Sequence, residues 1–369
     1  MESDVPPNPY RIRRDAPVGG RPSPRPRSGG CAWIVVSFVL AGLLGITWLG
    51  ILGTAGAGLA MTGNSLPNYW EEAVIEDNES DDRIVVIEVA GLISNIAIDT
   101  DGMTMVKSIR DQLAIAADDE SVKGVILKID SPGGEVLASD DIYREIQAFQ
   151  SVSQKPVVAS MSGLAASGGY YVAAPCRWIV ANELTITGSI GVILHSYNYR
   201  GLMDKVGVRP QVFKSGRFKD MLSGDKALDE ILPETQTMIQ AMIDETFDRF
   251  KTVVREGRTE AESQNNGTGR ALVENWEDFA DGRIFSGKQA FELGFVDELG
   301  NFDQAVSRIE TLVGSSEVDL IKYQLPFSFG NIFQIFGKAE ASQIKVDLGI
   351  PFPQLQAGRL YFLSSTFFQ

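Results

Sequence analysis

Residues 157–175 read VVASMSGLAASGGYYVAAP, and the chain is organised around this stretch. Residues 157–161 form an apolar run typical of a buried parallel strand. After it the side chains become small, which predicts the start of a closely packed helix. Ser167 then lies at a strand-to-helix turn, where backbone amides point outward and favour negative charge. This position suits a nucleophile whose attack creates an oxyanion, but small residues can also serve only to pack a helix on a sheet.

A second stretch has the same organisation. Residues 126–130 (ILKID) have a strand pattern and run into SPGG at residues 131–134, followed by a helical pattern over residues 135–150. Proline fixes one φ angle, and two glycines permit a turn with exposed amides. Two such strand–turn–helix units, about thirty residues apart, would place two backbone donors near one serine hydroxyl.

The flanking sequence continues the alternation of strands and helices. Strands are expected at residues 84–93 and 177–181, an amphipathic helix at 104–117, and a glycine-punctuated turn into a further strand at 186–192. This order predicts an α/β fold with a mostly parallel sheet and right-handed crossovers.

The second half of the body is expected to contain more helix. Residues 211–222 predict a short strand, a Ser-Gly turn and a helix start, residues 233–257 a long charged helix, and residues 260–270 an exposed loop. A strand, a helix capped by Ser286 and a last helix to about residue 313 follow.

Composition limits the function classes. The net charge is −15, and residues 1–30 carry six arginines against three acidic residues, so the remainder is near −18 and argues against nucleic acid as a partner. Two cysteines, Cys31 and Cys176, are too few for a disulfide scaffold, and we expect no bridge between them. One histidine, His195, excludes a histidine-rich metal site.

The N-terminal sequence predicts membrane attachment. Residues 1–30, rich in Pro, Gly and Arg, are expected to be a disordered basic tail, and the uncharged residues 31–61 are long enough to span a bilayer. The arginines ahead of this span place the N-terminus in the cytoplasm and the body beyond the inner (cytoplasmic) membrane. A cleaved signal peptide is the alternative, but the run is longer than a usual signal-peptide core.

Three further segments complete the expected organisation. Residues 62–82 are a polar linker and residues 83–315 the folded body. The Phe-rich residues 316–369 are either a hydrophobic patch at a membrane or subunit interface, or a loosely packed domain edge.

Two residues compete as the base for Ser167. Histidine is the usual base near neutral pH, and His195 follows at a spacing similar to that in the Clp proteases, but its surroundings have loop character. Lys219 can act only as a neutral amine, a form favoured by burial and nearby positive charge. Asp220 would oppose that role, so we expect it to point away from Lys219; Lys214 is a weaker alternative base.

Four motifs resemble one known family. SPGG, AASGGYY, TGSIG at residues 187–191 and SG-x-x-KD at residues 215–220 are similar to motifs of the signal peptide peptidase A family, serine proteases of the Clp and crotonase superfamily. The resemblance covers roughly residues 83–315 and implies repeated ββα units around the sheet. It also implies Ser167 as nucleophile, Lys219 as general base, the Gly134 and Gly168 amides as oxyanion donors, and Ser189 as a residue that orients the lysine.

The resemblance also implies an activity and an assembly. A membrane-anchored serine endopeptidase would degrade cleaved signal peptides and other unfolded apolar segments, with no cofactor or metal. No internal repeat is visible, as in the single-copy members of the family, which form homo-oligomeric rings with active sites shared between subunits. The alternatives are a crotonase-type acyl-CoA enzyme with a similar oxyanion hole, and a catalytically dead scaffold that binds membrane proteins.

Overall fold

The computed structural model describes residues 70–97, 102–315, 317–325 and 361–363, which all belong to one compact unit, Leu66–Gln369. The expected tail and membrane span at residues 1–61 lie outside this range, as does most of the Phe-rich extension. Within the described ranges, none of the helices combines the length and apolar character that a bilayer crossing requires.

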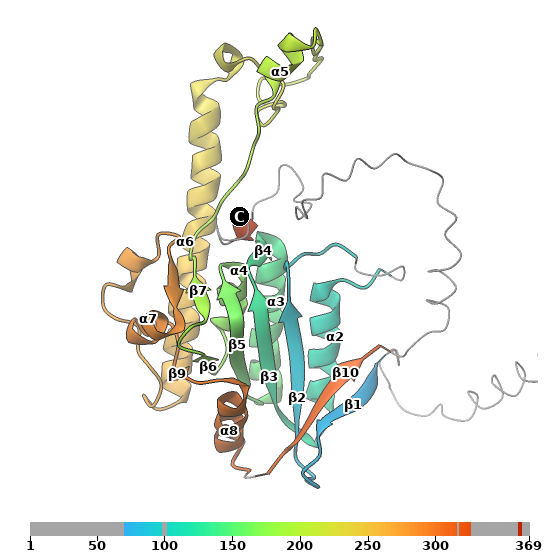
Figure 1. Ribbon diagram of the computed structural model, residues 1–369, viewed down its shortest axis with the longest axis vertical. Coiled ribbons are helices and arrows are strands. Elements are labelled where there is room, and N and C mark those ends of the chain that lie inside the picture. Colours follow the sequence, from blue (N-terminus) through green and yellow to red (C-terminus); the bar gives the residue numbers. More distant parts are fainter. Residues whose placement is uncertain (1–69, 98–101, 316, 326–360, 364–369) are drawn as a thin grey trace, which may run out of the picture. The chain divides into compact units, whose positions relative to one another are not determined.

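The described residues form a nine-stranded, mostly parallel sheet (Figure 1). Its main path has the order β1-β10-β2-β3-β5-β6-β9, and only the β1–β10 pair on this path is antiparallel. The strands on this path are β1 (Glu71–Glu76), β10 (Asp319–Gln324), β2 (Arg83–Ala90), β3 (Val122–Ser131), β5 (Val157–Ala166), β6 (Trp178–Ala181) and β9 (Glu298–Leu299). The predicted mixed α/β fold with a mostly parallel sheet is therefore confirmed.

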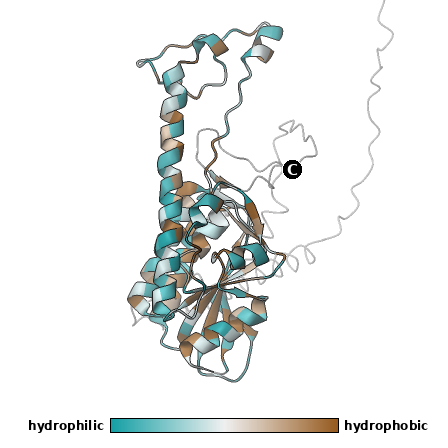
Figure 2. Cartoon of the chain, turned by 90° about the vertical axis from the view of Figure 1, so that its left-hand side faces the viewer, coloured by the Kyte–Doolittle hydropathy of each residue, from teal (hydrophilic) through white to brown (hydrophobic). Residues whose placement is uncertain are grey.

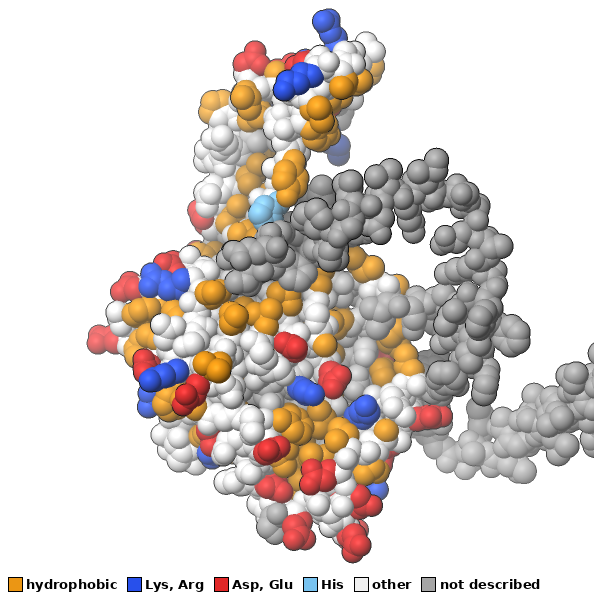
Figure 3. Space-filling model, in the orientation of Figure 1, with side chains coloured by type: hydrophobic (Ala, Val, Ile, Leu, Met, Phe, Trp, Pro, Cys, Tyr) orange, Lys and Arg blue, Asp and Glu red, His pale blue; other side chains and the backbone are white. Residues whose placement is uncertain are grey.

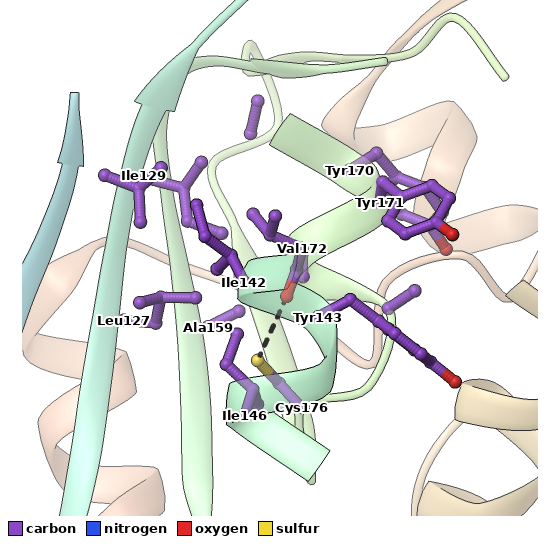
Figure 4. Close-up of a cluster of buried hydrophobic side chains, with 14 of the residues drawn as sticks. Leu127, Ile129, Ile142, Tyr143, Ile146, Ala159, Tyr170, Tyr171, Val172 and Cys176 are labelled. Atoms are coloured by element: carbon purple, nitrogen blue, oxygen red, sulfur yellow. Dashed lines mark hydrogen bonds between the residues drawn. The ribbon is translucent and has the colours of Figure 1, made fainter. Parts of the chain in front are cut away.

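Two apolar layers cover the sheet, because alternate residues of each strand face opposite sides. In β3, Leu127 and Ile129 face the larger cluster, whereas Ile126 faces the smaller one. The larger cluster lies against α2 (Met105–Asp118), α3 (Val136–Ser153) and α4 (Gly168–Ala173); the smaller lies against α8 (Phe302–Val313). Figure 4 shows side chains of the larger cluster around Cys176, a free buried cysteine whose thiol donates to the Val172 carbonyl.

Capping side chains fix two of the predicted helix starts. Thr104 accepts a hydrogen bond from the Lys107 amide at the start of α2, and Ser286 accepts one from the Gln289 amide at α7 (Gly287–Glu292). Each cap satisfies an amide that has no partner inside its helix. The Ser286 cap and the last helix, which ends at Val313, agree with the sequence prediction.

The C-terminal end of α2 is held by a lysine from another segment. Lys155 Nζ donates to the carbonyls of Ala116, Ala117 and Asp119 at 2.7–3.0 Å. These carbonyls lie where a helix lacks internal donors and where a positive charge is favourable.

We expect Lys155→Met to lower the free energy of unfolding by about 1–2 kcal/mol, because it keeps the apolar stem and removes only the charged donor. Urea denaturation would measure the change. The control is Lys123→Met. The Lys123 amine donates to one carbonyl, that of Glu120, and forms a surface ion pair with Asp82. Its loss should change the free energy of unfolding by less than about 0.5 kcal/mol. Equal losses in the two variants would contradict the capping role.

Four expectations about element boundaries need correction. β5 continues through Ala166, and α4 begins only at Gly168. Helix α6 (Pro233–Gln264) continues into the expected loop. Residues 211–222 form bends and turns without strand or helix, since they have no neighbouring strand to pair with. Strand β1 lies within the expected linker, because β10 pairs with it along the sheet edge.

One segment extends away from the sheet. Residues 194–232, here called the arm, connect the body to α6 and contain the short helix α5 (Arg200–Lys205). The arm lies beyond the edge where strands β2, β3 and β5 end (Figure 1). Among its residues only Gly224 is buried, and the first half of α6, coloured teal along much of its length in Figure 2, is mostly exposed.

Candidate active site

Ser167 is the single residue between β5 and α4. Its backbone has φ 56° and ψ −116°, a conformation that non-glycine residues rarely adopt and that costs on the order of 1–3 kcal/mol. The Ser167 amide donates to the Gly188 carbonyl of β7 (Ile186–Gly188) at 2.8 Å, which fixes the turn. The side chain is fully buried, and its hydroxyl has no hydrogen-bond partner among the described residues. A strained, buried and unpartnered hydroxyl indicates a functional role.

This strain can be measured. We expect Ser167→Gly to be more stable than Ser167→Ala by about 1 kcal/mol, because glycine adopts a positive φ without a steric penalty. Both variants lack the hydroxyl, so the comparison removes its contribution. Their free energies of unfolding in urea give the comparison. If the alanine variant proves equally stable, residue 167 is not strained.

The two glycine turns meet beside Ser167. Strand β4 (Gly133–Glu135) follows Ser131 and Pro132, and a methyl group on Gly168 would lie 3.0 Å from the Gly134 amide nitrogen. A methyl group on Gly133 would lie 2.6 Å from the Gly168 amide nitrogen, and Gly133 has φ +105°, so only glycine fits there. The structure thus brings Ser167, Gly134 and Gly168 together.

A strand from the C-terminal region lies across this turn. Strand β11 (Tyr361–Leu363) pairs antiparallel with β4, with Phe362 opposite Gly134. The Gly133 carbonyl and the Glu135 amide are bonded to Ile93. Because adjacent residues of a strand point their backbone groups to opposite sides, the Gly134 amide and carbonyl face β11. On the other edge of β11, Tyr361 exchanges two backbone hydrogen bonds with Ile193.

Phe362 fills an aromatic pocket next to the serine turn. Its side chain is fully buried, stacked on Tyr171 with ring centroids 4.9 Å apart and tilted against Phe250 at 4.7 Å. Tyr171 belongs to α4, four residues after Ser167, and Phe250 belongs to α6. The sequence does not predict this pocket, because no local pattern links residue 362 to residues 171 and 250.

A charged network behind the pocket fixes Tyr171. The Tyr171 hydroxyl donates to Asp140 Oδ1 at 2.7 Å, and Arg144 and Arg249 also donate to this carboxylate. Burial alone would raise the pKa of Asp140, but these hydrogen bonds outweigh it and hold the pKa below its usual range. The sequence indicates the Arg144 contact, because Arg144 follows Asp140 by four residues, a spacing at which helical side chains meet. It gives no indication of Arg249, which is 109 residues from Asp140.

Ser189 lies next to Ser167 through the pairing of β5 and β7. Ala166 is opposite Gly188, so Ser189 follows directly after the residue that anchors Ser167. Ser189 is also buried with a positive φ, 51°. It lines a cavity of about 300 Å³ together with Gln240, Ile243, Asp244 and Phe247 of α6. A larger cavity of about 620 Å³ between α3 and α6 contains none of the predicted site residues.

The predicted base Lys219 and its rival His195 both lie on the arm. Lys219 and His195 are both exposed, and neither donates to or accepts from Ser167, whose hydroxyl lacks a partner among the described residues. Within the ranges that the structure describes, Ser167 is therefore not joined to a base of its own chain. Asp220 is bound by Lys214 and Lys226, and no ion pair joins it to Lys219 among the described residues. Across the described ranges, no cluster of three or more His, Cys, Asp or Glu could hold a metal ion.

Comparison with known proteins assigns the fold and then the family. Residues 93–177, which contain both glycine turns, match the Clp protease family, and residues 150–316 match peptidase family S49. The fold is therefore Clp-protease-like.

Individual relatives agree. A protein of Enterococcus faecium, provisionally named signal peptide peptidase SppA, is 34% identical over 264 residues, 70% of this chain and 71% of its own length. A protein of Synechocystis sp. named as a protease is 44% identical over 198 residues, which cover 53% of this chain and 65% of that protein. The chain belongs to peptidase family S49, the family of signal peptide peptidase A.

Proposed function

We propose that this chain is a membrane-anchored serine endopeptidase in which Ser167 attacks the peptide bond and Lys219 from a neighbouring copy is the general base. The observation that carries the proposal is Ser167 itself, which lies beside the two glycine turns with a strained backbone and a buried hydroxyl that has no partner within the described ranges. A structural serine would gain stability from a hydrogen bond, whereas a nucleophile must keep its oxygen available.

The reaction follows from these groups. A neutral Lys219 amine takes the Ser167 proton as the serine oxygen attacks the carbonyl carbon, and the negative oxygen that forms accepts hydrogen bonds from the Gly134 and Gly168 amides. The lysine then gives its proton to the leaving amine, which breaks the peptide bond and leaves an acyl-serine. Water, deprotonated by the same lysine, hydrolyses this ester. Ser189, which lines the adjacent cavity, would orient the lysine amine.

Strand β11 supports an extended peptide as substrate. It demonstrates that the edge of β4 accepts an antiparallel strand and that the neighbouring pocket accepts an apolar side chain. Peptides that add a strand to a sheet edge gain affinity from the backbone and specificity from such pockets. We infer that substrates are unfolded apolar segments, cleaved signal peptides among them, bound with an aromatic or aliphatic residue in the place of Phe362.

Exposed apolar side chains on the arm support a shared site. Figure 3 shows apolar side chains on the arm, a surface that a second copy would cover. Eight of its large hydrophobic residues are more than 45% exposed: Tyr197, Tyr199, Leu202, Val206, Val208, Val212, Phe213 and Leu228. The same arm carries Lys219. A ring in which each arm reaches the Ser167 of the next subunit would complete every site, because its interfaces are head-to-tail.

The uncharged residues 31–61 are the proposed anchor, with the catalytic body outside the cytoplasm. A protease added to spheroplasts should then digest the body of the full-length protein from outside. A body that is protected until the cells are lysed would refute this orientation.

A fluorophosphonate probe tests the nucleophile. The full-length protein in detergent should be labelled at Ser167, whereas Ser167→Ala should stay unlabelled and should not hydrolyse casein. The control Ser162→Ala changes a serine in the same strand, five residues before the site, and should label normally. Labelling at another serine, or casein hydrolysis by Ser167→Ala, would overturn the proposed function.

A further inference from the structure

The residue after Lys219 is an aspartate held by two other lysines. Lys214 Nζ lies 2.8 Å from both carboxylate oxygens of Asp220, and Lys226 Nζ lies 3.2 Å from Oδ1. The side chains of Asp220 and Lys226 are only 13% and 11% exposed, so these contacts lie inside the arm. Asp220 is therefore occupied from two sides.

The same contacts shape the turn that carries Lys219. The Lys219 amide donates to the Gly216 carbonyl at 3.2 Å, and Lys214 Nζ also donates to the Arg217 carbonyl at 3.3 Å. Asp220 points into the arm while Lys219 is exposed. Within the part of the chain that the structure describes, Lys219 has no ion pair.

Two lysines face the single carboxylate of Asp220. Lys214 and Lys226 bring two positive charges against its one negative charge. Elsewhere on the arm, Arg217 pairs with Glu234 of α6, and Arg200 of α5 pairs with both Asp204 and Glu230. Asp225 accepts from Ser223. The hydrogen bond from Lys214 and the contact with Lys226 hold the pKa of Asp220 below its usual value.

We propose that Lys214 and Lys226 are positioning residues for catalysis: they bind the Asp220 carboxylate and thereby prevent it from pairing with the Lys219 amine. This inference rests on the proposed function, in which Lys219 must be neutral to accept the Ser167 proton. A free carboxylate beside the amine would stabilise the ammonium form. The contacts of Asp220 with Lys214 and Lys226 also hold the backbone turn that carries Lys219. The same contacts therefore orient Lys219 and keep its amine unpaired.

The test compares two proteins. The double variant Lys214→Gln/Lys226→Gln releases the Asp220 carboxylate, and the triple variant adds Asp220→Asn, which removes the charge of that carboxylate. Casein hydrolysis by the full-length protein is measured from mildly acidic to alkaline pH. Releasing the carboxylate should move the midpoint of the activity–pH curve upward by about one pH unit. This is the small end of the shift that a nearby opposite charge causes, because solvent screens the partly exposed site. Turnover on the acidic side of the curve should fall about tenfold. Adding Asp220→Asn should return the midpoint to its original place.

Three results would overturn the inference. They are an unchanged midpoint in the double variant, a midpoint that Asp220→Asn fails to restore, and an equal shift in the control Lys205→Gln, which removes a positive charge from the same arm without touching Asp220. Gel filtration of each variant reports whether the arm still folds and assembles. If the proposed function itself is wrong, the result differs: Lys219→Met keeps its turnover, whatever the Lys214→Gln/Lys226→Gln variant shows.

Discussion

Co-expression of Ser167→Ala and Lys219→Ala chains should restore about a quarter of wild-type turnover, although each variant alone should be inactive. If a site is built from the Ser167 of one subunit and the Lys219 of the next, the first variant still offers a lysine and the second still offers a serine. In a closed ring with random mixing, each of the two intact residues occurs at an interface with a probability of one half, so roughly one interface in four is complete. Turnover per total protein gives the measurement.

The control for this experiment is the double variant Ser167→Ala/Lys219→Ala. Mixed with either single variant, it cannot contribute the missing residue to a complete site, so no turnover should return. Affinity tags that differ between the two chains show whether they assemble together. Single variants that co-assemble and still show no turnover would place both residues in one chain and refute the shared site.

Lys219→Ala should reduce turnover by about 10²–10⁴-fold, the usual contribution of a general base, whereas His195→Gln should retain most of it. Only the neutral amine accepts a proton. Wild-type turnover should therefore increase with pH as the base loses its proton and should be low on the acidic side. Initial rates of casein hydrolysis across the pH range measure both effects.

The histidine variant decides between the two candidate bases. If His195→Gln is the inactive protein and Lys219→Ala keeps its rate, the Clp-like arrangement with a histidine base holds. A flat profile from mildly acidic to alkaline pH would also count against lysine.

Local sequence patterns predicted the part of the site that lies on neighbouring strands. β3 and β5 are adjacent and parallel, so the turns after them meet at one edge, and this brings Gly134 and Gly168 to Ser167. Their apolar runs and the glycines that follow were enough to place these turns.

Long-range pairings could not be predicted in this way. The pairing of Phe362 with Gly134 joins residues more than two hundred positions apart, and a three-residue strand has no periodicity of its own. The same holds for β1 and β10, at opposite ends of the body. Helix α6 extends past its expected end at residue 257 because Arg258 and Ala261 are buried against the body, so tertiary packing outweighs the polar residues around them.

If peptides bind along the edge of β4 as proposed, strand β11 changes how their concentration should act on this protein. Because β11 belongs to the same chain as β4, each subunit carries one strand that occupies its own β4 edge. Dilution of the protein does not change this one-to-one ratio. A free peptide instead binds by mass action and competes with the effective concentration of β11 in its own chain. Scarce or weakly apolar peptides would then leave β11 paired with β4, and only a local accumulation of apolar segments would displace it.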